Sequence, residues 1–271
     1  MKLESFEFIT KSENRARLFL KKACWKNALI FCTRCNSRKV YRIIGKRYRC
    51  KRCRYTFHDF SKRWLWIIKL FELELSASKI AQQVGLSYPT VLRAVTIIRL
   101  AILASKETEI FLGGEIEIDE SYFGGRKKGK RGRGAARKVP VFGILERNGV
   151  VKVNIVSDVT AESLLNMTVR TVRRGSIVYT DKFRSYDALM FCGYRHIKIN
   201  HSKQFASGKV YINGLEGFWS YAKERLIKFH GVSGEKFPLY LKEMEFRYNN
   251  RHGNIFNLMV HNLCNLVPNR L

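Results

Sequence analysis

Four cysteines in two identically spaced pairs constrain the fold of this chain more than any other feature of its sequence. Cys32 and Cys35 form one pair and Cys50 and Cys53 the other, with 14 residues between the pairs. Two residues between paired cysteines let a tight turn aim both sulfurs at one ion, and Zn²⁺ favours four thiolates in a tetrahedron. Bulky and β-branched residues flank Gly45 between the pairs, which predicts two short strands around a turn. We therefore expect a zinc ribbon in which these four cysteines bind structural Zn²⁺.

Other uses of these cysteines explain the spacing less well. Two redox-active pairs, or four buried thiols, do not require two pairs with the same separation. Seven cysteines in a chain of 271 residues do not indicate a disulfide framework, and this grouping is typical of metal ligation in a reducing compartment. Cys24, Cys192 and Cys264 have no partner at ligand spacing, so we interpret them as small hydrophobic residues without a chemical role.

The charge balance indicates a polyanionic partner. The chain has 51 Lys and Arg against 22 Asp and Glu, a formal net charge of +29, which exceeds what solubility favours. A membrane surface is the alternative, but it usually attracts one basic amphipathic helix, whereas here the bases run along the whole chain. Lys69 interrupts the apolar run WLWIIKLF, and Glu4 and Glu7 stand where a signal peptide has its apolar core. We therefore expect a nucleic-acid-binding protein that stays inside the cell and has no membrane partner.

Residues 61–104 have the hydrophobic period of α-helices. Gly85 interrupts the pattern, Ser87 is placed as an N-cap, and Pro89 falls in the first turn of the helix that follows. This order predicts a helix-turn-helix unit. The apolar positions of its helices are Trp64, Ile67, Ile68 and Phe71, then Ile80, Ala81 and Val84, then Val91, Leu92, Val95 and Ile98.

In such a unit the start of the second helix enters the major groove of DNA. Tyr88, Thr90 and Arg93 are therefore predicted to face the groove, and Arg99 to contact a phosphate. An ordinary helical hairpin explains the isolated pattern equally well. The preceding zinc ribbon and the basic chain favour DNA binding.

The rest of the chain predicts an α/β domain. Alternating and apolar runs indicate strands, and longer amphipathic runs indicate helices. The predicted order is strands at 115–123, 139–146 and 150–159, a helix at 161–172, a strand at 176–183, a short helix at 185–193, a strand at 195–199 and a long helix at 212–229. This succession resembles the ribonuclease-H-like fold, which implies a mixed sheet flanked by helices that brings carboxylates from separated segments into one cleft.

Three carboxylates occupy positions where such a cleft needs them. Asp119 lies within the first strand, Asp181 at the end of the fourth and Glu216 on the long helix, 62 and 35 residues apart. Convergent carboxylates hold two hard cations about 4 Å apart, one activating an attacking oxygen and one stabilising a leaving oxygen. The set therefore indicates phosphodiester chemistry with Mg²⁺ or Mn²⁺.

Taken singly, each acid has a plainer interpretation. Asp119 is in phase with Glu115 and Glu117, which fits a solvated edge strand, and for this strand alone that reading is the better one. Asp181 fits a turn or cap. Glu216 and Lys223 fit the exposed side of an amphipathic helix, beside a core stripe. That stripe comprises Leu215, Trp219, Ala222, Leu226 and Phe229.

Several blocks of residues make a family resemblance specific. EIDESYFGG, YTDKFRSY, YINGLEGFWSYAKERL and LKEMEFRYNNR resemble the signature blocks of bacterial insertion-sequence transposases of the DDE superfamily, in the subgroup with an N-terminal zinc ribbon. The resemblance covers nearly the whole chain. It implies that Asp119, Asp181 and Glu216 are the catalytic triad and that Lys223 is a basic residue two turns after the glutamate. Some relatives carry asparagine in the third role, so Asn213 is a further candidate for the same pocket.

Outside the triad, two more features are placed near the expected cleft. A basic loop follows the first strand of the α/β domain and is predicted to clamp a DNA backbone. Its bases are Arg126, Lys127, Lys128, Lys130, Arg131, Arg133, Arg137 and Lys138. His196 and His201 flank the last strand and are possible site contacts, although a lone histidine more often has a structural role.

These predictions divide the chain into residues 1–58 with the zinc ribbon, 59–106 with the helix-turn-helix, and 107–271 with the ribonuclease-H-like catalytic domain and C-terminal helices. The resemblance implies a bacterial DNA transposase, cytoplasmic and nucleoid-associated, that cleaves the ends of its element and joins the 3′-hydroxyls to target DNA. Because two ends must meet, it also implies a homodimer or higher oligomer. The alternatives are a DNA-binding regulator with an inactive catalytic scaffold and a metal-dependent nuclease without strand transfer.

Overall fold

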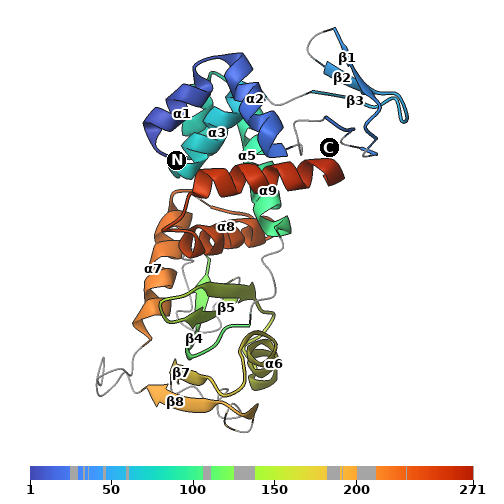
Figure 1. The fold of residues 1–271 in the computed structure, drawn as a ribbon. Coiled ribbons are helices and arrows are strands. Elements are labelled where there is room, and N and C mark those ends of the chain that lie inside the picture. The colour runs from blue at the N-terminus through green and yellow to red at the C-terminus, as the bar shows by residue number, and fades with distance from the viewer. Residues whose placement is uncertain are drawn as a thin grey trace. The chain divides into compact units, whose positions relative to one another are not determined.

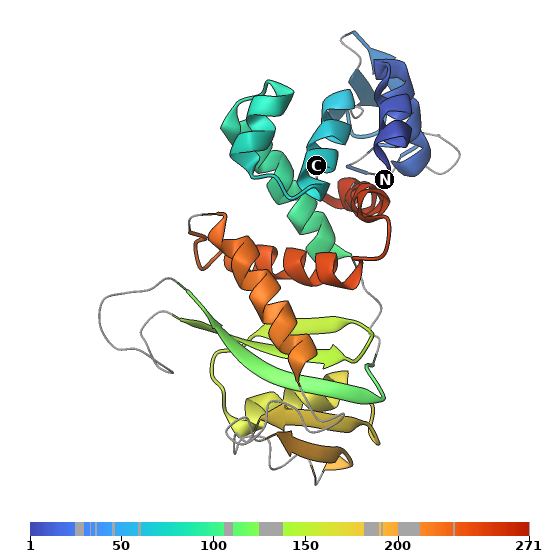
Figure 2. The same ribbon diagram turned by 90° about the vertical axis from the view of Figure 1, so that its left-hand side faces the viewer.

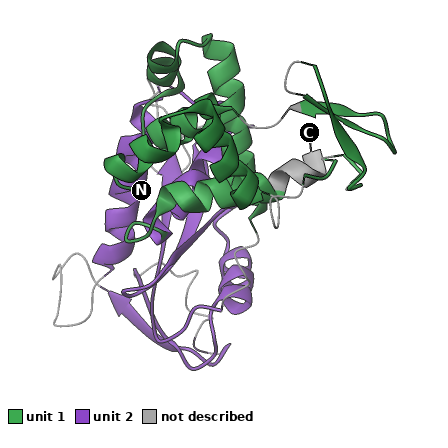
Figure 3. Cartoon of the chain, turned by 45° about the horizontal axis from the view of Figure 1, so that its top comes forward, with its two compact units in different colours: residues 1–105, 250–271 green, residues 106–249 purple. Residues whose placement is uncertain are grey.

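A computed structural model gives the fold of the chain, which forms two compact units (Figure 3). Unit 1 comprises residues 1–105 and 250–271, and unit 2 comprises residues 106–249. The structure describes residues 1–24, 30–32, 34–35, 37–44, 47–58, 61–105, 111–124, 138–181, 190, 192–199, 212–229 and 231–270.

Unit 2 is built on one five-stranded mixed sheet with the strand order β6-β5-β4-β7-β8 (Figure 1). Its elements are β4 (Glu115–Phe123), β5 (Val139–Glu146), β6 (Val151–Ile155), α6 (Ala161–Thr171), β7 (Ile177–Asp181), β8 (Arg195–Ile199), α7 (Asn213–Ile227) and α8 (Phe237–Asn249). The pairs β4–β5 and β5–β6 are antiparallel, whereas β4–β7 and β7–β8 are parallel. The predicted ribonuclease-H-like class, a mixed sheet flanked by helices, is confirmed. Most of the predicted short helix at 185–193 lies outside the described residues.

The strand β4 is the centre of this sheet, so the interpretation of its acids as a solvated edge is wrong. One face of β4 carries Ile116 and Ile118, which are buried in a core with Leu164 of α6. The opposite face is covered by α7, which lies across the sheet in Figure 2. Glu117 on that face is fully buried, because the helix excludes water from it. Alternation of charge along a strand therefore did not mean exposure here.

The edge strand β6 is covered by polar side chains of α8. Asn249 accepts a hydrogen bond from the Val151 N–H at 2.8 Å and donates one to the Val151 carbonyl at 2.9 Å. Glu245 accepts from the Val153 N–H at 2.8 Å, and Lys242 donates to the Val153 carbonyl at 2.8 Å. These three side chains satisfy backbone groups that an edge strand otherwise exposes for pairing with another chain. The block LKEMEFRYNNR thus contributes to the closure of the sheet edge.

Unit 1 combines a three-stranded antiparallel sheet with a group of helices. The sheet contains β1 (Val40–Ile43), β2 (Arg47–Cys50) and β3 (Thr56–His58), so the two strands expected around Gly45 are joined by a third. The helices are α1 (Leu3–Thr10), α2 (Glu13–Cys24), α3 (Lys62–Glu72), α4 (Ala77–Val84), α5 (Tyr88–Ala104) and α9 (Ile255–Arg270). The helices α1 and α2 were not predicted.

The turn between α4 and α5 has Gly85, Ser87 and Pro89 at the predicted positions, although the Ser87 side chain makes no cap hydrogen bond to the backbone of α5. Gly85 ends α4 with a φ of 63°, a left-handed conformation that glycine adopts without steric cost. Ser87 precedes α5, where its hydroxyl lies 2.8 Å from that of Thr90. The chain bends by 118° between the two helices, within the range of helix-turn-helix units. Among the described helices no single one has the length and hydropathy of a membrane span, and only this bent pair passes such a test when taken together.

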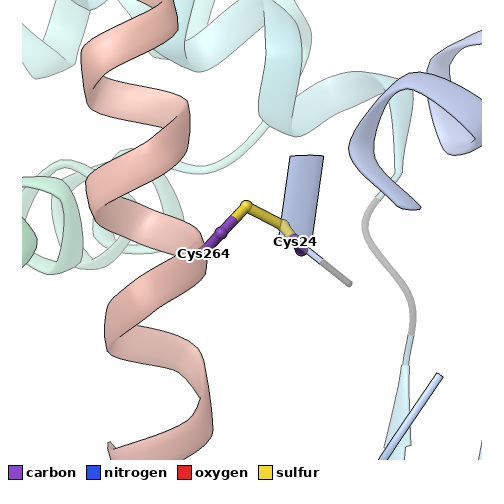
Figure 4. Close-up of a disulfide and its surroundings, with 2 residues drawn as sticks. All are labelled: Cys24 and Cys264. Atoms are coloured by element: carbon purple, nitrogen blue, oxygen red, sulfur yellow. A yellow bond between two sulfur atoms is a disulfide. The ribbon is translucent and has the colours of Figure 1, made fainter. Parts of the chain in front are cut away.

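The C-terminal helix differs from its predicted place. Residues 250–271 were grouped with the catalytic domain, but α9 packs against α2, α3 and α5 in unit 1. Cys24 at the end of α2 and Cys264 in α9 form a disulfide (Figure 4). The interpretation of these two cysteines as residues without chemistry is therefore wrong. Their 240-residue separation hid the pairing, because only the docking of α9 on α2 brings them together.

The capped edge of β6 leads to a stability prediction. We expect Asn249→Ala to lower the free energy of unfolding by about 1–3 kcal/mol, because it leaves both backbone groups of Val151 without their partner. Denaturant unfolding followed by circular dichroism measures this change. Asn257→Ala, on the exposed side of α9, is the matched control and should change the value by less than about 0.5 kcal/mol. Equal effects of the two substitutions would contradict the role of Asn249.

Candidate metal centre and active site

The four paired cysteines converge in unit 1. Their sulfur atoms all lie within 4.8 Å of one another, with Cys32 and Cys53 sulfurs 3.5 Å apart and Cys35 and Cys50 sulfurs 3.6 Å apart. Four thiolates bound to Zn²⁺ at about 2.3 Å place their sulfurs about 3.8 Å from one another. The cluster therefore has the composition and the size of a tetrahedral zinc site.

Backbone donors prepare this cluster for metal. The N–H groups of Arg52 and Cys53 point to the Cys50 sulfur at 3.3 and 3.5 Å, and that of Arg34 points to the Cys32 sulfur at 3.4 Å. Burial opposes ionisation of Cys50, but these donors and the neighbouring thiols lower its pKa to about 6. Burial raises the pKa of Cys32 to about 12. A cation at the centre would offset that burial by stabilising the thiolate.

Two of the three predicted acidic residues lie on adjacent strands of the sheet in unit 2. The parallel pairing of β4 and β7 joins Glu115 to Ile177 and Glu117 to Tyr179, a constant offset of 62 residues. The paired stretch ends at Glu117 and Tyr179, and Asp119 and Asp181 each follow two residues later, so both point to the same face of the sheet. The 62-residue interval noticed in the sequence is thus the register of two adjacent strands.

The surroundings of Asp119 disfavour its charge. Burial raises the pKa of Asp119 to about 7, and the charges of Glu120 and Asp181 act in the same direction. Hydrogen bonds from the Glu120 backbone and from the Trp219 indole act the other way, the latter at 3.1 Å to Oδ2 of Asp119. Carboxylates held together in a partly desolvated place lack positive charge, which is the condition that a divalent cation satisfies.

A buried carboxylate anchors α7 above these acids. Glu117 accepts a hydrogen bond from the N–H of Leu215, in the first turn of α7, at 2.9 Å. Its other oxygen accepts from Nε of Arg147 at 3.0 Å, and the Arg147 guanidinium also pairs with Glu115 and lies 3.9 Å from the Tyr179 ring centre. A carboxylate at the N-terminus of a helix is favoured by its free N–H groups and dipole. Glu117 thereby fixes where α7 begins relative to β4.

The position of Glu216 follows from that anchor. Phe218 faces α8, since its ring lies 5.2 Å from that of Tyr248, and α8 covers the β6 side of the sheet. Residues two apart on an α-helix point roughly 160° from one another, so Glu216 lies on the side of α7 opposite to Phe218, where it is exposed. Its carboxylate is therefore free of the core that holds Phe218.

Two other predicted residues lie on the same helix. Asn213 is the first residue of α7 and is exposed, one turn before Glu216. Lys223, also exposed, points in nearly the same direction as Glu216, because seven residues make almost two full turns. Its ammonium lies 5.7 Å from the ring centre of Phe123 on β4.

Sequence reasoning missed two residues that touch this site. Trp219 was assigned only to the core stripe, although a buried indole N–H needs a hydrogen-bond partner. Gly143 lies directly opposite Asp119 on β5, and a Cβ there would come within 2.6 Å of the Trp219 ring. A glycine inside the apolar run VPVFGILE is the signal that could have found this close approach.

Other predicted contacts divide into four groups. Tyr88, Thr90 and Arg93 are exposed at the start of α5, as a DNA-reading role requires. Arg99 is buried with its guanidinium 5.3 Å from the Phe71 ring centre, so the phosphate contact predicted for it is wrong. His196 lies on the sheet face opposite Asp181 and shares a 2.8 Å hydrogen bond with Thr180. Outside the described residues lie His201 and Arg126, Lys127, Lys128, Lys130, Arg131, Arg133 and Arg137 of the basic loop.

Comparison with protein-family models gives two matches. Residues 111–249 match the model described as the ISXO2-like transposase domain, and residues 11–56 match the transposase zinc-ribbon domain. The first match covers the sheet, α7 and α8, and the second covers the four-cysteine cluster. Together they account for both places where the structure gathers reactive side chains.

Individual proteins similar to the chain carry related descriptions. A transposase-like protein of Haemophilus influenzae is 49% identical over 96 residues, 35% of this chain and 78% of that protein. A protein in the transposable element ISH50 of Halobacterium salinarum is 29% identical over 87% of this chain and 90% of its own length. Among solved structures, the Mos1 strand transfer complex has 14% identity, coverage of 74% and 73%, and a TM-score of 0.34.

The thiolate cluster predicts a zinc dependence. Cys50→Ser should leave the purified protein with most of its zinc lost, because it removes one of four ligands and the thiolate that its backbone donors favour. Metal analysis by mass spectrometry measures the bound zinc. Cys192→Ser, a half-buried cysteine outside the cluster, should retain the wild-type content. Full zinc in Cys50→Ser would rule out this ligand set.

The raised pKa of Asp119 predicts a pH-dependent cost in stability. As the pH rises from about 4 to about 7, the unfolded chain ionises at the usual value of 3.8 while the folded chain resists ionisation, so the native state loses stability. In zinc-loaded protein without Mg²⁺ or Mn²⁺, Asp119→Asn should therefore have a higher Tm than wild type at pH 8, and the difference should shrink toward pH 4. Differential scanning calorimetry across this range measures it.

Asp158 is a matched control, because its pKa is shifted in the opposite direction to that of Asp119. Hydrogen bonds from Ser163 and Thr160 lower the pKa of Asp158, so its charge favours the folded state above about pH 4. Asp158→Asn should lower the Tm at neutral pH and lose this effect in acid. A lower Tm for Asp119→Asn at pH 8 would show that its carboxylate is not desolvated.

Proposed function

Because the chain belongs to the ISXO2-like transposase family, we propose that it is a metal-dependent DNA transposase that cleaves the ends of its insertion sequence and joins their 3′-hydroxyls to target DNA. The observation that supports this proposal is that Asp119 and Asp181 lie on the same face of adjacent parallel strands, close enough for the charge of Asp181 to raise the pKa of Asp119. We propose that Glu216, exposed on α7, supplies the third carboxylate.

The described residues fit a divalent-metal site. Their oxygens are the ligands that Mg²⁺ and Mn²⁺ prefer, and the pKa of Asp119 is raised in part by the neighbouring charge of Asp181. Bound metal would supply the positive charge that activates an attacking oxygen and stabilises a leaving one. The protein contributes the placement: Glu117 fixes the start of α7, and the pairing of β4 with β7 puts the two aspartates on one face of the sheet. The same three carboxylates serve both cleavage and joining in this proposal.

The DNA is held by elements outside the carboxylate cluster. In unit 1 α5 directly follows the 118° bend and is the second helix of the bent pair. The exposed residues at its start, Tyr88, Thr90 and Arg93, are proposed to enter the major groove. In unit 2 Lys223 extends from the side of α7 that carries Glu216 and is proposed to bind a phosphate near the reacting bond. A homodimer or higher oligomer would bring two ends together.

A cleavage and joining assay tests the proposal. The full-length, zinc-loaded protein is incubated with Mg²⁺ or Mn²⁺, a plasmid target and labelled DNA that carries the inverted repeats flanking its gene. We expect nicking at the repeat ends and joined products. Asp181→Asn should reduce both by roughly 10³-fold, since metal charge stabilisation is worth several kcal/mol. Asp158→Asn, at an exposed aspartate between β6 and α6 that is not a member of the triad, should retain activity.

The outcomes separate the competing functions. Cleavage without joining would favour a nuclease, and repeat binding without cleavage would favour a DNA-binding regulator. Activity that survives Asp181→Asn would exclude the carboxylate mechanism. Glu216→Gln should match the loss in Asp181→Asn, whereas Asn213→Ala should retain measurable activity, because a carboxylate binds a divalent cation better than an amide does. The reverse order would assign the third position to Asn213.

A further inference from the structure

The side chain of Trp219 touches the proposed metal site without being able to bind metal. Its indole N–H donates to Oδ2 of Asp119 at 3.1 Å, and indole nitrogen has a hydrogen to donate but no lone pair to offer a cation. Asp119 therefore has one oxygen taken by the ring. A hydrogen bond from the Glu120 backbone also reaches this carboxylate, so the indole fixes one oxygen, Oδ2, and leaves Oδ1 without a bond from the ring.

The neighbouring strand is adapted to this ring. Gly143 pairs with Asp119 across β4 and β5, and the Trp219 ring lies over it. A Cβ at position 143 would approach Cζ2 of the ring at 2.6 Å and Cη2 at 2.8 Å, distances at which something must shift. The nearest movable group is the indole itself. A glycine opposite the aspartate is thus required for the hydrogen bond to form.

The ring is also held from its other sides. Phe123 lies four residues after Asp119 on the same face of β4. The ring centres of Phe123 and Phe218 lie 5.9 and 5.3 Å from that of Trp219, both in edge-to-face geometry. Trp219 is 4% exposed. Packing on several sides leaves the indole little freedom to rotate, so the direction of its N–H is set before any ligand arrives.

We propose that Trp219 is a positioning residue of the carboxylate site, which holds Oδ2 of Asp119 so that Oδ1 is presented to the metal, and that Gly143 is present to admit the ring. This inference rests on the proposed function, since it assumes that Asp119 binds the cation. Outer partners that orient a metal ligand typically change metal affinity 10- to 100-fold when they are removed. Loss of the indole N–H should therefore lower the affinity for metal, and not only loosen the packing of the core.

Metal titration of the full-length, zinc-loaded protein tests the proposal. The probe is Mn²⁺, and the signal of free Mn²⁺ in electron paramagnetic resonance gives the Kd. Trp219→Phe keeps an aromatic ring but removes the N–H, and it should weaken Mn²⁺ binding about tenfold or more. Trp66→Phe, a partly exposed tryptophan of α3 in unit 1, is the matched control and should leave the Kd unchanged.

A second variant tests the role of the glycine. Gly143→Ala forces the indole away from Asp119, so it should weaken Mn²⁺ binding by a similar factor while residue 219 is still tryptophan. In Trp219→Phe the hydrogen bond is already absent, and adding Gly143→Ala should then weaken binding by clearly less than it does alone. Fully additive losses would overturn the proposal that the glycine acts through the ring.

Failure of this inference is distinguishable from failure of the proposed function. If Trp219→Phe lowers the Tm but binds Mn²⁺ like the wild type, the ring is a packing residue and the inference is overturned. If Asp119→Ala also binds Mn²⁺ like the wild type, the carboxylate site itself is excluded and the proposed function fails with it. Loss of binding in Asp119→Ala together with weaker binding in Trp219→Phe supports both.

Discussion

The hydrogen bond between the Leu215 N–H and the buried Glu117 carboxylate is the interaction on which the rest of the proposed active site depends. It joins the start of α7 to the central strand of the sheet, and Arg147 balances the charge of the buried acid. Breaking a buried pair of this kind by removing one partner typically costs about 3–5 kcal/mol. Once the first turn of α7 is fixed, the helical repeat places Trp219 where its indole bonds Asp119 and leaves Glu216 exposed on the same helix.

Ionisation of Asp119, in the proposed active site of unit 2, is electrostatically unfavourable in the folded protein. The chain carries a net charge of +29, yet burial and the like charges of Glu120 and Asp181 raise the pKa of Asp119 to about 7. Such a site is less stable when it is empty of cations and gains stability when they bind. Strain of this kind is common at functional sites, where groups are held in an arrangement that the fold alone does not favour.

Some residues in the blocks that carry the family resemblance have a structural role and not a catalytic one. In the block LKEMEFRYNNR, the side chains of Lys242, Glu245 and Asn249 bond the backbone of the edge strand β6. An uncovered edge is prone to pair with another chain, so these polar side chains have a structural role in this chain. The family resemblance therefore identified the domain that contains the proposed active site. The hydrogen bonds distinguish residues near the carboxylates from residues that cover the edge strand β6.

The sequence by itself determined the elements that depend on local spacing: the paired cysteines Cys32, Cys35, Cys50 and Cys53, the Gly85 turn, and most strands and helices of unit 2. Turn residues and hydrophobic periodicity depend on residues that are close together in the chain, so they can be recognised in the sequence alone. Tertiary structure alone decided that β4 is central, that Arg99 is buried, that Cys24 meets Cys264 and that Trp219 bonds Asp119. Each of these depends on which distant segment packs on which face, and strand order and helix docking leave no local trace in the chain.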